Sequence, residues 1–380
     1  MSTQHLIFIF PLVFGLTIEI NAQKDFCQRL NQNGLIFCDD FESGKAISTL
    51  YFEHNNNNGD FVPMPAVGRD ASTGMRVLWQ KDEVAAGGLS KSFGRTPQAY
   101  IGRNAAMPDS TFMEVFWRMD VRHQEGWQGS GPAKLSRALC LANANWATGA
   151  HGHLWSGGPG DAFLGMDPAS GINTQGTLVS TKYNDFANLR WLGFKHGNIP
   201  MFSSERAAEW HCVEGHIKLN TPGNNNGLME FWINDTIQAG SYNLNWHGNW
   251  NSNPNNYGIN AIFFENYWNA GSPVQQERYF DNLVIATQRI GCNQLTSSTS
   301  KPDQDPIKIW FDQNGMLNWD AESNQIYRLK IMSPQGQIIS VIDIQNSGRT
   351  EIENQLPAGI YFYQLNRGAD ILSSGKLNIY

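Results

Sequence analysis

The sequence predicts an all-β protein: a large two-sheet jelly-roll sandwich followed by a small Ig-like β-sandwich. From residue 34 to residue 286, short alternating or apolar runs are interrupted by Gly, Asn and Pro, and very few stretches are long enough for a helix. Charged residues make up only 16% of the 380 residues, while 38 Asn, 37 Gly and 13 Trp indicate a neutral, aromatic surface with many turns. This composition argues against a coiled coil and against a disordered chain.

Eight segments of the first domain have the length and pattern of strands. They are Leu35–Phe41, Phe112–Val121, Ala133–Ala142, His151–Trp155, Trp210–Leu219, Met229–Ile233, Ala261–Tyr267 and Tyr279–Ala286. A region of roughly 250 residues is too long for one immunoglobulin-type sandwich of ~100 residues and fits a large jelly roll.

The N-terminus has the features of an export signal. Leu6–Leu16 is apolar for about the length of a signal-peptide core, and Ala22 offers a cleavage point, so residues 1–22 are predicted to be removed. No later apolar run reaches the ~18 residues of a transmembrane helix. We therefore expect a secreted or cell-surface protein with no membrane span.

Composition also sets the boundary between the two domains. The jelly roll is predicted for residues 23–293. Residues 294–306 contain almost nothing that can be buried, which is typical of a linker. Residues 307–380 alternate again, over a length that suffices for a small sandwich of seven strands.

Export would place the five cysteines where disulfides form, and the odd number leaves at least one unpaired. Cys27 lies just before the first strand-like run and Cys292 just after the last run of the first domain, so a disulfide between Cys27 and Cys292 is one alternative. A disulfide between Cys27 and Cys38 is an equal alternative. No spacing forms a CxxC pair, which disfavours structural zinc.

The charge balance disfavours nucleic acid as a partner. The formal net charge is -7, and no long basic stripe is present on which phosphates could be neutralised. Neutral or anionic sugars remain candidate partners.

The C-terminal region carries two motifs that together point to a known family. Leu356–Phe362 reads LPAGIYF, and Gly375–Tyr380 reads GKLNIY. This combination resembles the C-terminal sorting domain of the bacterial type IX secretion system. The resemblance covers residues 307–380 and implies an outer-membrane translocon as partner; an ordinary appended Ig-like module is the alternative.

The first domain carries a looser resemblance. Phe37–Glu42 (FCDDFE), Trp210–Gly223 with Phe231–Ile233 after it, and Tyr279–Val284 (YFDNLV) resemble the concanavalin A-like jelly rolls of polysaccharide lyases related to heparin lyase and glucuronan lyase. The resemblance implies a uronic-acid polysaccharide as substrate. The ExDxxE array of the laminarinase-like hydrolases is missing from the sequence, which counts against a retaining glycosidase.

Strand alternation selects the side chains that face away from the core. In Ala133–Leu141 the apolar residues Leu135, Leu139 and Leu141 are assigned to the core, which turns Lys134, Ser136 and Cys140 outward and leaves Arg137 out of phase, as a bulge would. The same reasoning turns a set of polar and aromatic residues outward: Glu114, Arg118, His151, His153, Trp155, Glu214, His216, Lys218, Phe263, Glu265 and Tyr267. We expect several of them to share one binding face.

Elimination from a uronic acid requires a group that neutralises the carboxylate, a base and an acid. The candidates are Lys134 or Arg118 for neutralisation, His153 or His216 (beside Glu214) as base, and Tyr267 or Tyr183 as acid. Substrate binding is assigned to these residues: Arg118, Trp155, Tyr183, Lys218 and Trp268.

Two other readings of the same residues remain. Hydrolysis would need two carboxyl groups, for which Glu214 with Glu114 or Glu265 are the available pairs. A noncatalytic carbohydrate-binding protein would use aromatic stacking alone, with these tryptophans: Trp155, Trp232, Trp246, Trp250 and Trp268. A surface adhesin without a sugar ligand ranks last.

Asp281 lies on the last strand of the jelly roll, which in this architecture pairs with the first strand. The first strand carries Asp39, Asp40 and Glu42. Carboxylates and carbonyls at this junction would suit a structural Ca²⁺, with an Asp that hydrogen-bonds the turn as the alternative.

Overall fold

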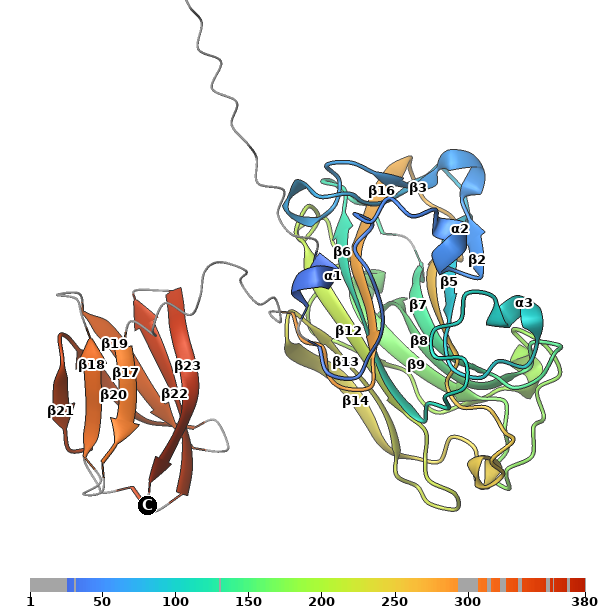
Figure 1. The fold of residues 1–380 in the computed structure, drawn as a ribbon. Coiled ribbons are helices and arrows are strands. Elements are labelled where there is room, and N and C mark those ends of the chain that lie inside the picture. Colours follow the sequence, from blue (N-terminus) through green and yellow to red (C-terminus); the bar gives the residue numbers. More distant parts are fainter. Residues whose placement is uncertain are drawn as a thin grey trace, which may run out of the picture. The chain divides into compact units, whose positions relative to one another are not determined.

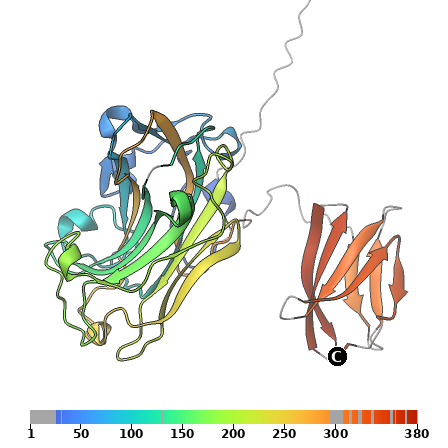
Figure 2. The ribbon, with the colours of Figure 1, turned by 180° about the vertical axis from the view of Figure 1, so that it is seen from behind.

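The protein is described from a computed structural model (Figures 1 and 2). It divides into two units, Met1–Ser297 and Ser298–Tyr380, each of which is described by itself. The predicted signal peptide at 1–22 and the predicted linker at 294–306 lie outside the described residues. The described residues are 26–30, 32–129, 131–292, 307–312, 316–321, 326–333, 337–352, 356–357, 359–367 and 370–379.

Two antiparallel eight-stranded sheets form the first unit. In the first sheet, here called the β12 sheet, the strand order is β14-β13-β12-β6-β16-β4-β3, and β1 also pairs with β16. Figure 1 shows β16 beside β6, although the two strands lie far apart in the sequence. The strands are β1 (Leu35–Asp39), β3 (Phe61–Met64), β4 (Gly74–Trp79), β6 (Glu114–His123), β12 (His211–Lys218), β13 (Gly227–Ile233), β14 (Thr236–Leu244) and β16 (Gln276–Ala286).

The second sheet, here called the β8 sheet, has the order β10-β9-β8-β7-β15-β5-β2, with β11 also paired to β9. Its strands are β2 (Glu53–Asn55), β5 (Ala85–Ser92), β7 (Lys134–Leu141), β8 (Thr148–Gly157), β9 (Phe163–Ser170), β10 (Arg190–Trp191), β11 (Lys195–His196) and β15 (Ala261–Tyr267).

In the described part of the first unit, helices are single turns at most, because Gly, Asn and Pro interrupt the longer candidates there. Asn57 and Asn58 both take positive φ in the Asn-rich segment after β2, as their turn propensity predicts. None of the helices in the described part of the chain has the length and hydropathy required to span a bilayer. The helical turns are α1 (Phe26–Arg29), α2 (Ile47–Leu50), α3 (Ala99–Gly102), η1 (Asn57–Gly59), η2 (Arg69–Ala71), η3 (Pro159–Asp161), η4 (Phe186–Asn188) and η5 (Trp250–Ser252).

The core lies between the two sheets and is rich in tryptophan. Trp79, Trp127 and Trp268 pack against one another with ring centroids 5.3–5.9 Å apart. Trp268 is only 1% exposed, so the prediction that it stacks on a sugar is wrong: its indole fills the core. Trp246 is fully buried in the same core.

The second unit is a small sandwich. Its described residues form seven strands, in a three-stranded sheet of order β17-β18-β21 and a four-stranded sheet of order β20-β19-β22-β23. The core includes Leu329, Ile331 and Leu365. The predicted fold class is confirmed in both units. The strands are β17 (Ile307–Phe311), β18 (Leu317–Ala321), β19 (Tyr327–Met332), β20 (Ile338–Ile344), β21 (Gly348–Thr350), β22 (Gly359–Arg367) and β23 (Asp370–Ile379).

Two disulfides are present. Cys27 pairs with Cys38, which was one of the two predicted alternatives, and Cys212 pairs with Cys292. The alternative Cys27–Cys292 bridge is therefore wrong. Cys140 is the unpaired cysteine and is buried in the core between the sheets.

Candidate functional site

The outward face of the β8 sheet, here called the β8 face, carries a row of polar residues. Asp167 on β9, His153 on β8, Arg137 on β7 and Phe263 on β15 are register partners from strand to strand. Their neighbours in sequence, such as Leu154, Ala138 and Ile262, lie in the core. Alternation therefore places these four side chains on one face.

A β-bulge in β7 explains why Arg137 is part of this row. The register between β7 and β8 shifts between Lys134 and Ser136, so Lys134 and Arg137 both face outward although three positions separate them. The bulge also corrects the predicted phase of the rest of the strand. Ser136 accepts a hydrogen bond from Trp117 in the core, Cys140 is also inward, and Leu139 packs on the outer side.

Arg137 and Glu265 form a buried ion pair at the centre of the β8 face. The Arg137 Nε donates to a carboxylate oxygen of Glu265 at 2.6 Å, and the guanidinium also donates to the Tyr183 hydroxyl and to Asn184 Oδ1, the last at 2.9 Å. Burial disfavours the charged guanidinium, but Glu265 and Tyr183 outweigh it and raise the pKa of Arg137. Arg137 therefore stays charged and holds Tyr183 in place.

His153 lies beside this pair as a neutral imidazole. Burial, with help from the nearby His151, Arg137 and Lys134, holds the pKa of His153 well below its usual range. Its Nε2 has no hydrogen-bond partner and lies 3.9 Å from the nearer oxygen of Glu265. A neutral imidazole keeps one unprotonated ring nitrogen, which can accept a proton from a bound substrate.

Lys134 supplies a cation that no described carboxylate pairs with. Its Nζ lies 4.5 Å from the ring centroid of Tyr267, which is half-exposed. Burial lowers the pKa of Lys134 below the usual lysine value, and the charge of Glu265 offsets only part of this effect. Lys134 is therefore available to a negatively charged ligand.

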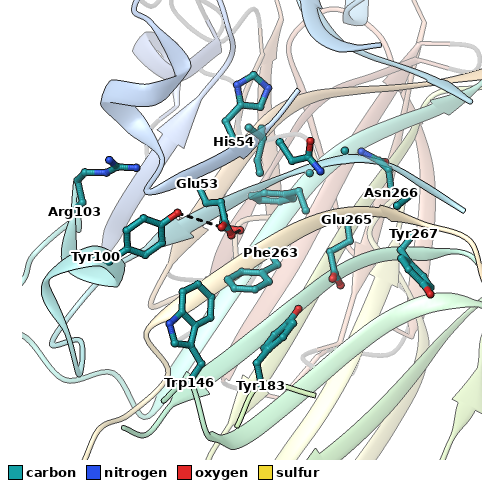
Figure 3. A pocket seen from close by; sticks show the side chains of 17 residues that line it. Glu53, His54, Tyr100, Arg103, Trp146, Tyr183, Phe263, Glu265, Asn266 and Tyr267 are labelled. Carbon is teal, nitrogen blue, oxygen red and sulfur yellow. Dashed lines mark hydrogen bonds between the residues drawn. The ribbon is translucent and has the colours of Figure 1, made fainter. Parts of the chain in front are cut away.

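A pocket of about 760 Å³ opens on this face between β15, β5 and β2 (Figure 3). Tyr100 donates its hydroxyl to Glu53 at 3.2 Å on one side of it. Tyr183 lines the other side, and burial raises its pKa to about 12, so its hydroxyl stays protonated. The lining is aromatic with two carboxylates: Glu53, Tyr100, Trp146, Tyr183, Phe263, Glu265 and Tyr267. Such a mixture of aromatic walls and a few polar groups suits a sugar-sized ligand.

The predicted site residues are divided between the two sheets. Lys134, His153, Trp155, Tyr183 and Tyr267 come together on the β8 face. Four others lie on the outward side of the β12 sheet: Arg118, Glu214, His216 and Lys218. These four residues therefore do not belong to the binding face that was expected for several of the outward residues. Alternation gave the outward direction of each residue correctly, but the two sheets expose opposite faces.

His216 is held within the β12 sheet by its neighbours. Its ring stacks on Phe116 with a centroid distance of 3.8 Å. Both ring nitrogens are paired, Nδ1 with Glu230 and Nε2 with Glu114, each at 2.9 Å. Nearby, α1 and the segment after β16 cover this face through an apolar cluster that includes Phe116. A histidine with both nitrogens occupied is a poor candidate for a base.

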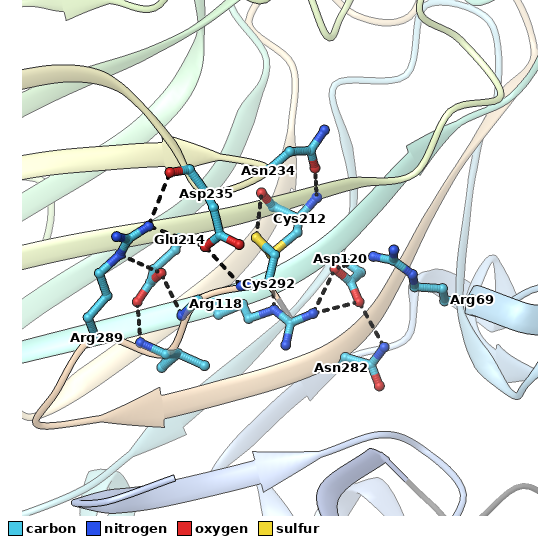
Figure 4. The surroundings of a disulfide bond; sticks show 12 residues. Arg69, Arg118, Asp120, Cys212, Glu214, Asn234, Asp235, Asn282, Arg289 and Cys292 are labelled. Carbon is cyan, nitrogen blue, oxygen red and sulfur yellow. Dashed lines mark hydrogen bonds and ion pairs between the residues drawn. A yellow bond between two sulfur atoms is a disulfide. The ribbon is translucent and has the colours of Figure 1, made fainter. Parts of the chain in front are cut away.

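Glu214 binds the backbone of the segment that follows β16 (Figure 4). Its fully buried carboxylate accepts hydrogen bonds from the amides of Ile290 at 2.6 Å and Gly291 at 3.0 Å, next to the Cys212–Cys292 disulfide. Glu265 lies on the other sheet, so the predicted hydrolytic pair of Glu214 and Glu265 cannot face one substrate. Burial accounts for the raised pKa of Glu214.

Arg118 is also occupied. Its guanidinium, 1% exposed, donates twice to Asp120 at 3.1 Å and once to the Cys212 sulfur (Figure 4). Asp120 is further bound by Arg69 and Asn282. Arg118 is thus part of a buried network and is not positioned to bind substrate.

The Asp281 region does not fit a calcium site. The Asp281 carboxylate accepts hydrogen bonds from the Arg69 amide, the Ser72 hydroxyl and the Asn282 amide. Burial raises its pKa to about 7. Among the described residues no cluster of three acidic, histidine or cysteine side chains could hold a metal ion. Asp39 also accepts hydrogen bonds, from Tyr51 and the Phe41 amide.

Several residues of the site were not predicted as part of it. The only sign of Arg137 in the sequence was a charged residue at a position where alternation expects an apolar one. The bulge in β7 explains this departure. Glu53, Tyr100 and Trp146 reach the pocket from a short edge strand, from the helical turn α3 and from a loop, where alternation gives no direction. Asp167 lies on a strand that the pattern did not reveal, because Gly165 and Pro168 interrupt it.

Comparisons with known proteins give fold likenesses only. No family model and no curated protein matches the sequence. An alginate lyase, vAL-1 from Chlorella virus, is 13% identical over 67% of this chain and 100% of that chain, with a TM-score of 0.47. An endo-β-1,4-glucuronan lyase from Trichoderma reesei is 11% identical over 67% and 96%, with a TM-score of 0.45. The cellulose-induced protein Cip1 is 16% identical over 68% and 100%, with a TM-score of 0.37. We rest no functional step on these structures.

Proposed function

We propose that the protein cleaves a uronic-acid-containing polysaccharide by β-elimination on the β8 face. One observation carries the proposal: a cation without a salt bridge to any described carboxylate, a neutral histidine and a protonated tyrosine, Tyr183, converge beside one aromatic pocket. These are the three kinds of group that elimination from a uronate requires.

In the proposed reaction, Lys134 binds the carboxylate of the uronic acid and stabilises the charge that develops when the C5 proton leaves. The unprotonated ring nitrogen of His153 takes that proton. The C4–O bond breaks as the C4=C5 double bond forms, and Tyr267 donates its proton to the departing oxygen. Arg137 holds both Tyr183 and Glu265 in place through its hydrogen bonds.

Absorbance near 235 nm tests the proposal directly, because β-elimination creates a conjugated double bond and hydrolysis does not. We expect the absorbance to rise with at least one polymer from a panel of uronic-acid polysaccharides. New reducing ends without this absorbance would overturn elimination and favour a hydrolase. Glu53 and Glu265, which both line the pocket, are then the pair to test.

Noncatalytic binding of carbohydrate is the second candidate function. The aromatic lining of the pocket favours it, and Trp155 lies on the same face beside His153, with ring centroids 4.7 Å apart. Three other tryptophans were considered for stacking. Trp232 lies on the outward side of the β12 sheet, and Trp246 and Trp268 are buried. Binding in the absence of any new double bond or reducing end would support this reading.

The C-terminal unit is proposed to direct export through an outer-membrane translocon. The motif residues Leu356–Phe362 and Gly375–Tyr380 support this role, and the two disulfides of the first unit suit an oxidising compartment. Deletion of residues 307–380 is expected to trap the protein in the periplasm of a host with this secretion system. Cell fractionation measures this, and normal export of the truncated chain would contradict the proposal.

A further inference from the structure

The short segment 190–196 forms the outer edge of the β8 sheet beyond the proposed catalytic residues. Its strands β10 and β11 both pair with β9, and Gly193 between them takes a φ of +113°, a conformation that favours glycine. The segment carries two large aromatic residues, Trp191 and Phe194, each 42% exposed. The pocket lies at the other end of this sheet, between β15, β5 and β2, so its walls do not account for these exposed rings.

Phe194 occupies space that two glycines leave open. A Cβ atom at Gly157 on β8 or at Gly165 on β9 would lie 2.5 Å from the ring of Phe194. The sheet thus lacks side chains where this ring packs. Trp155 borders the ring, with centroids 6.4 Å apart.

Trp191 lies two rows away on the same face. Its β9 partner is Ala169, which in turn pairs with His151 on β8, and the rings of Trp191 and His151 are 6.2 Å apart. Phe186 stacks against Trp191 at 6.2 Å with an interplanar angle of 22° and is itself 52% exposed. We call Trp155, Phe186, Trp191 and Phe194 the aromatic cradle.

Asp167 lies in the row between Trp191 and Phe194. It is the register partner of His153, is 9% exposed, and makes no hydrogen bond or ion pair with any described residue. The two cations of the edge segment turn elsewhere: Arg190 donates to the carbonyls of Asn245 and Trp246, and Lys195 donates to that of Gly240. The cradle therefore offers a hydrogen-bond acceptor and, among the described residues, no free cation.

We propose that the aromatic cradle binds an uncharged sugar ring next to the uronate at Lys134, so that the preferred polymer contains neutral sugars beside its uronic acids. This inference rests on the proposed function and narrows its substrate class. Aromatic rings contact the apolar face of a sugar, and Asp167 accepts a hydrogen bond from a hydroxyl. A uronate at the same position would place its carboxylate near Asp167 without a compensating cation, and this repulsion selects against it.

The experiment compares polymers of two kinds. Alginate and glucuronan carry a uronate in every unit, whereas hyaluronan and gellan place uncharged sugars beside glucuronate. We expect a higher kcat/KM, followed at 235 nm, on a polymer of the second kind. Trp191→Ala is expected to raise KM there by roughly tenfold, the equivalent of losing one aromatic contact, with kcat little changed. Tyr242→Ala, an equally exposed aromatic on the β12 sheet, is the matched control and should change neither.

Asp167→Asn provides the sharper variant, because it removes the charge and keeps the shape. It is expected to lower KM on alginate or glucuronan relative to hyaluronan or gellan. Preference of the wild type for the all-uronate polymers, or a Trp191→Ala variant with unchanged KM on both kinds, would overturn the inference.

A binding measurement separates this inference from the proposed function. Retardation of the wild type in gels that contain hyaluronan or gellan, lost in Trp191→Ala, would support the cradle even if no absorbance appears at 235 nm with any polymer. That absence of absorbance rejects elimination alone. Equal migration of wild type and Trp191→Ala in all these gels rejects the cradle.

Discussion

Alanine in place of His153 is expected to lower turnover, measured as the rise in absorbance at 235 nm, by ~10² to 10⁴-fold. This is the range that general base catalysis typically contributes. The ring nitrogen Nε2 of His153 has no hydrogen-bond partner, so its removal leaves no partner unsatisfied and the fold should survive. Thermal unfolding monitored by circular dichroism checks that the variant remains folded.

His216→Ala is the matched control on the opposite sheet. His216 stacks on Phe116 and binds Glu114 and Glu230, so its loss should cost stability and leave turnover within a few-fold of wild type. The sequence alone favours His216 as the base, with His153 as the alternative. If His216→Ala abolished turnover in a folded protein while His153→Ala did not, the site on the β8 face would be wrong.

Lys134→Met is expected to lower kcat/KM by ~10² to 10³-fold, the typical cost of removing one group that stabilises developing negative charge. Methionine keeps an apolar stem against Tyr267 and removes only the charge. Lys218→Met, on the β12 sheet and paired there with Glu114, is the control and should have little effect. Equal losses in the two variants would point to a general electrostatic effect on an anionic polymer.

The pH profile carries an independent signature of Lys134. The reaction needs the charged ammonium, so the rate should fall as pH rises through the pKa of Lys134, which burial places below the usual lysine value. His153 must be neutral, and burial keeps its pKa well below the usual histidine range, so the rate should persist into mildly acidic solution. In Lys134→Met, the alkaline decline should disappear from the residual activity.

Local pattern was sufficient for much of the architecture. Period-two alternation depends only on neighbours in the chain, and it predicted two β-sandwich units and the outward direction of His153, Glu265 and Tyr267 correctly. It failed within β7, where one extra residue reverses the phase. The out-of-phase Arg137 was the only local sign of that bulge.

The composition of the site was decided by tertiary structure. Whether two strands belong to the same sheet depends on pairing between segments far apart in the chain, such as β7 with β15 and β6 with β12. Alternation along one strand carries no information about such pairing. That pairing brings Arg137 to Glu265 and His153 to Asp167. It also turns His216 and Glu214 to the opposite side of the molecule, where packing and backbone amides occupy them.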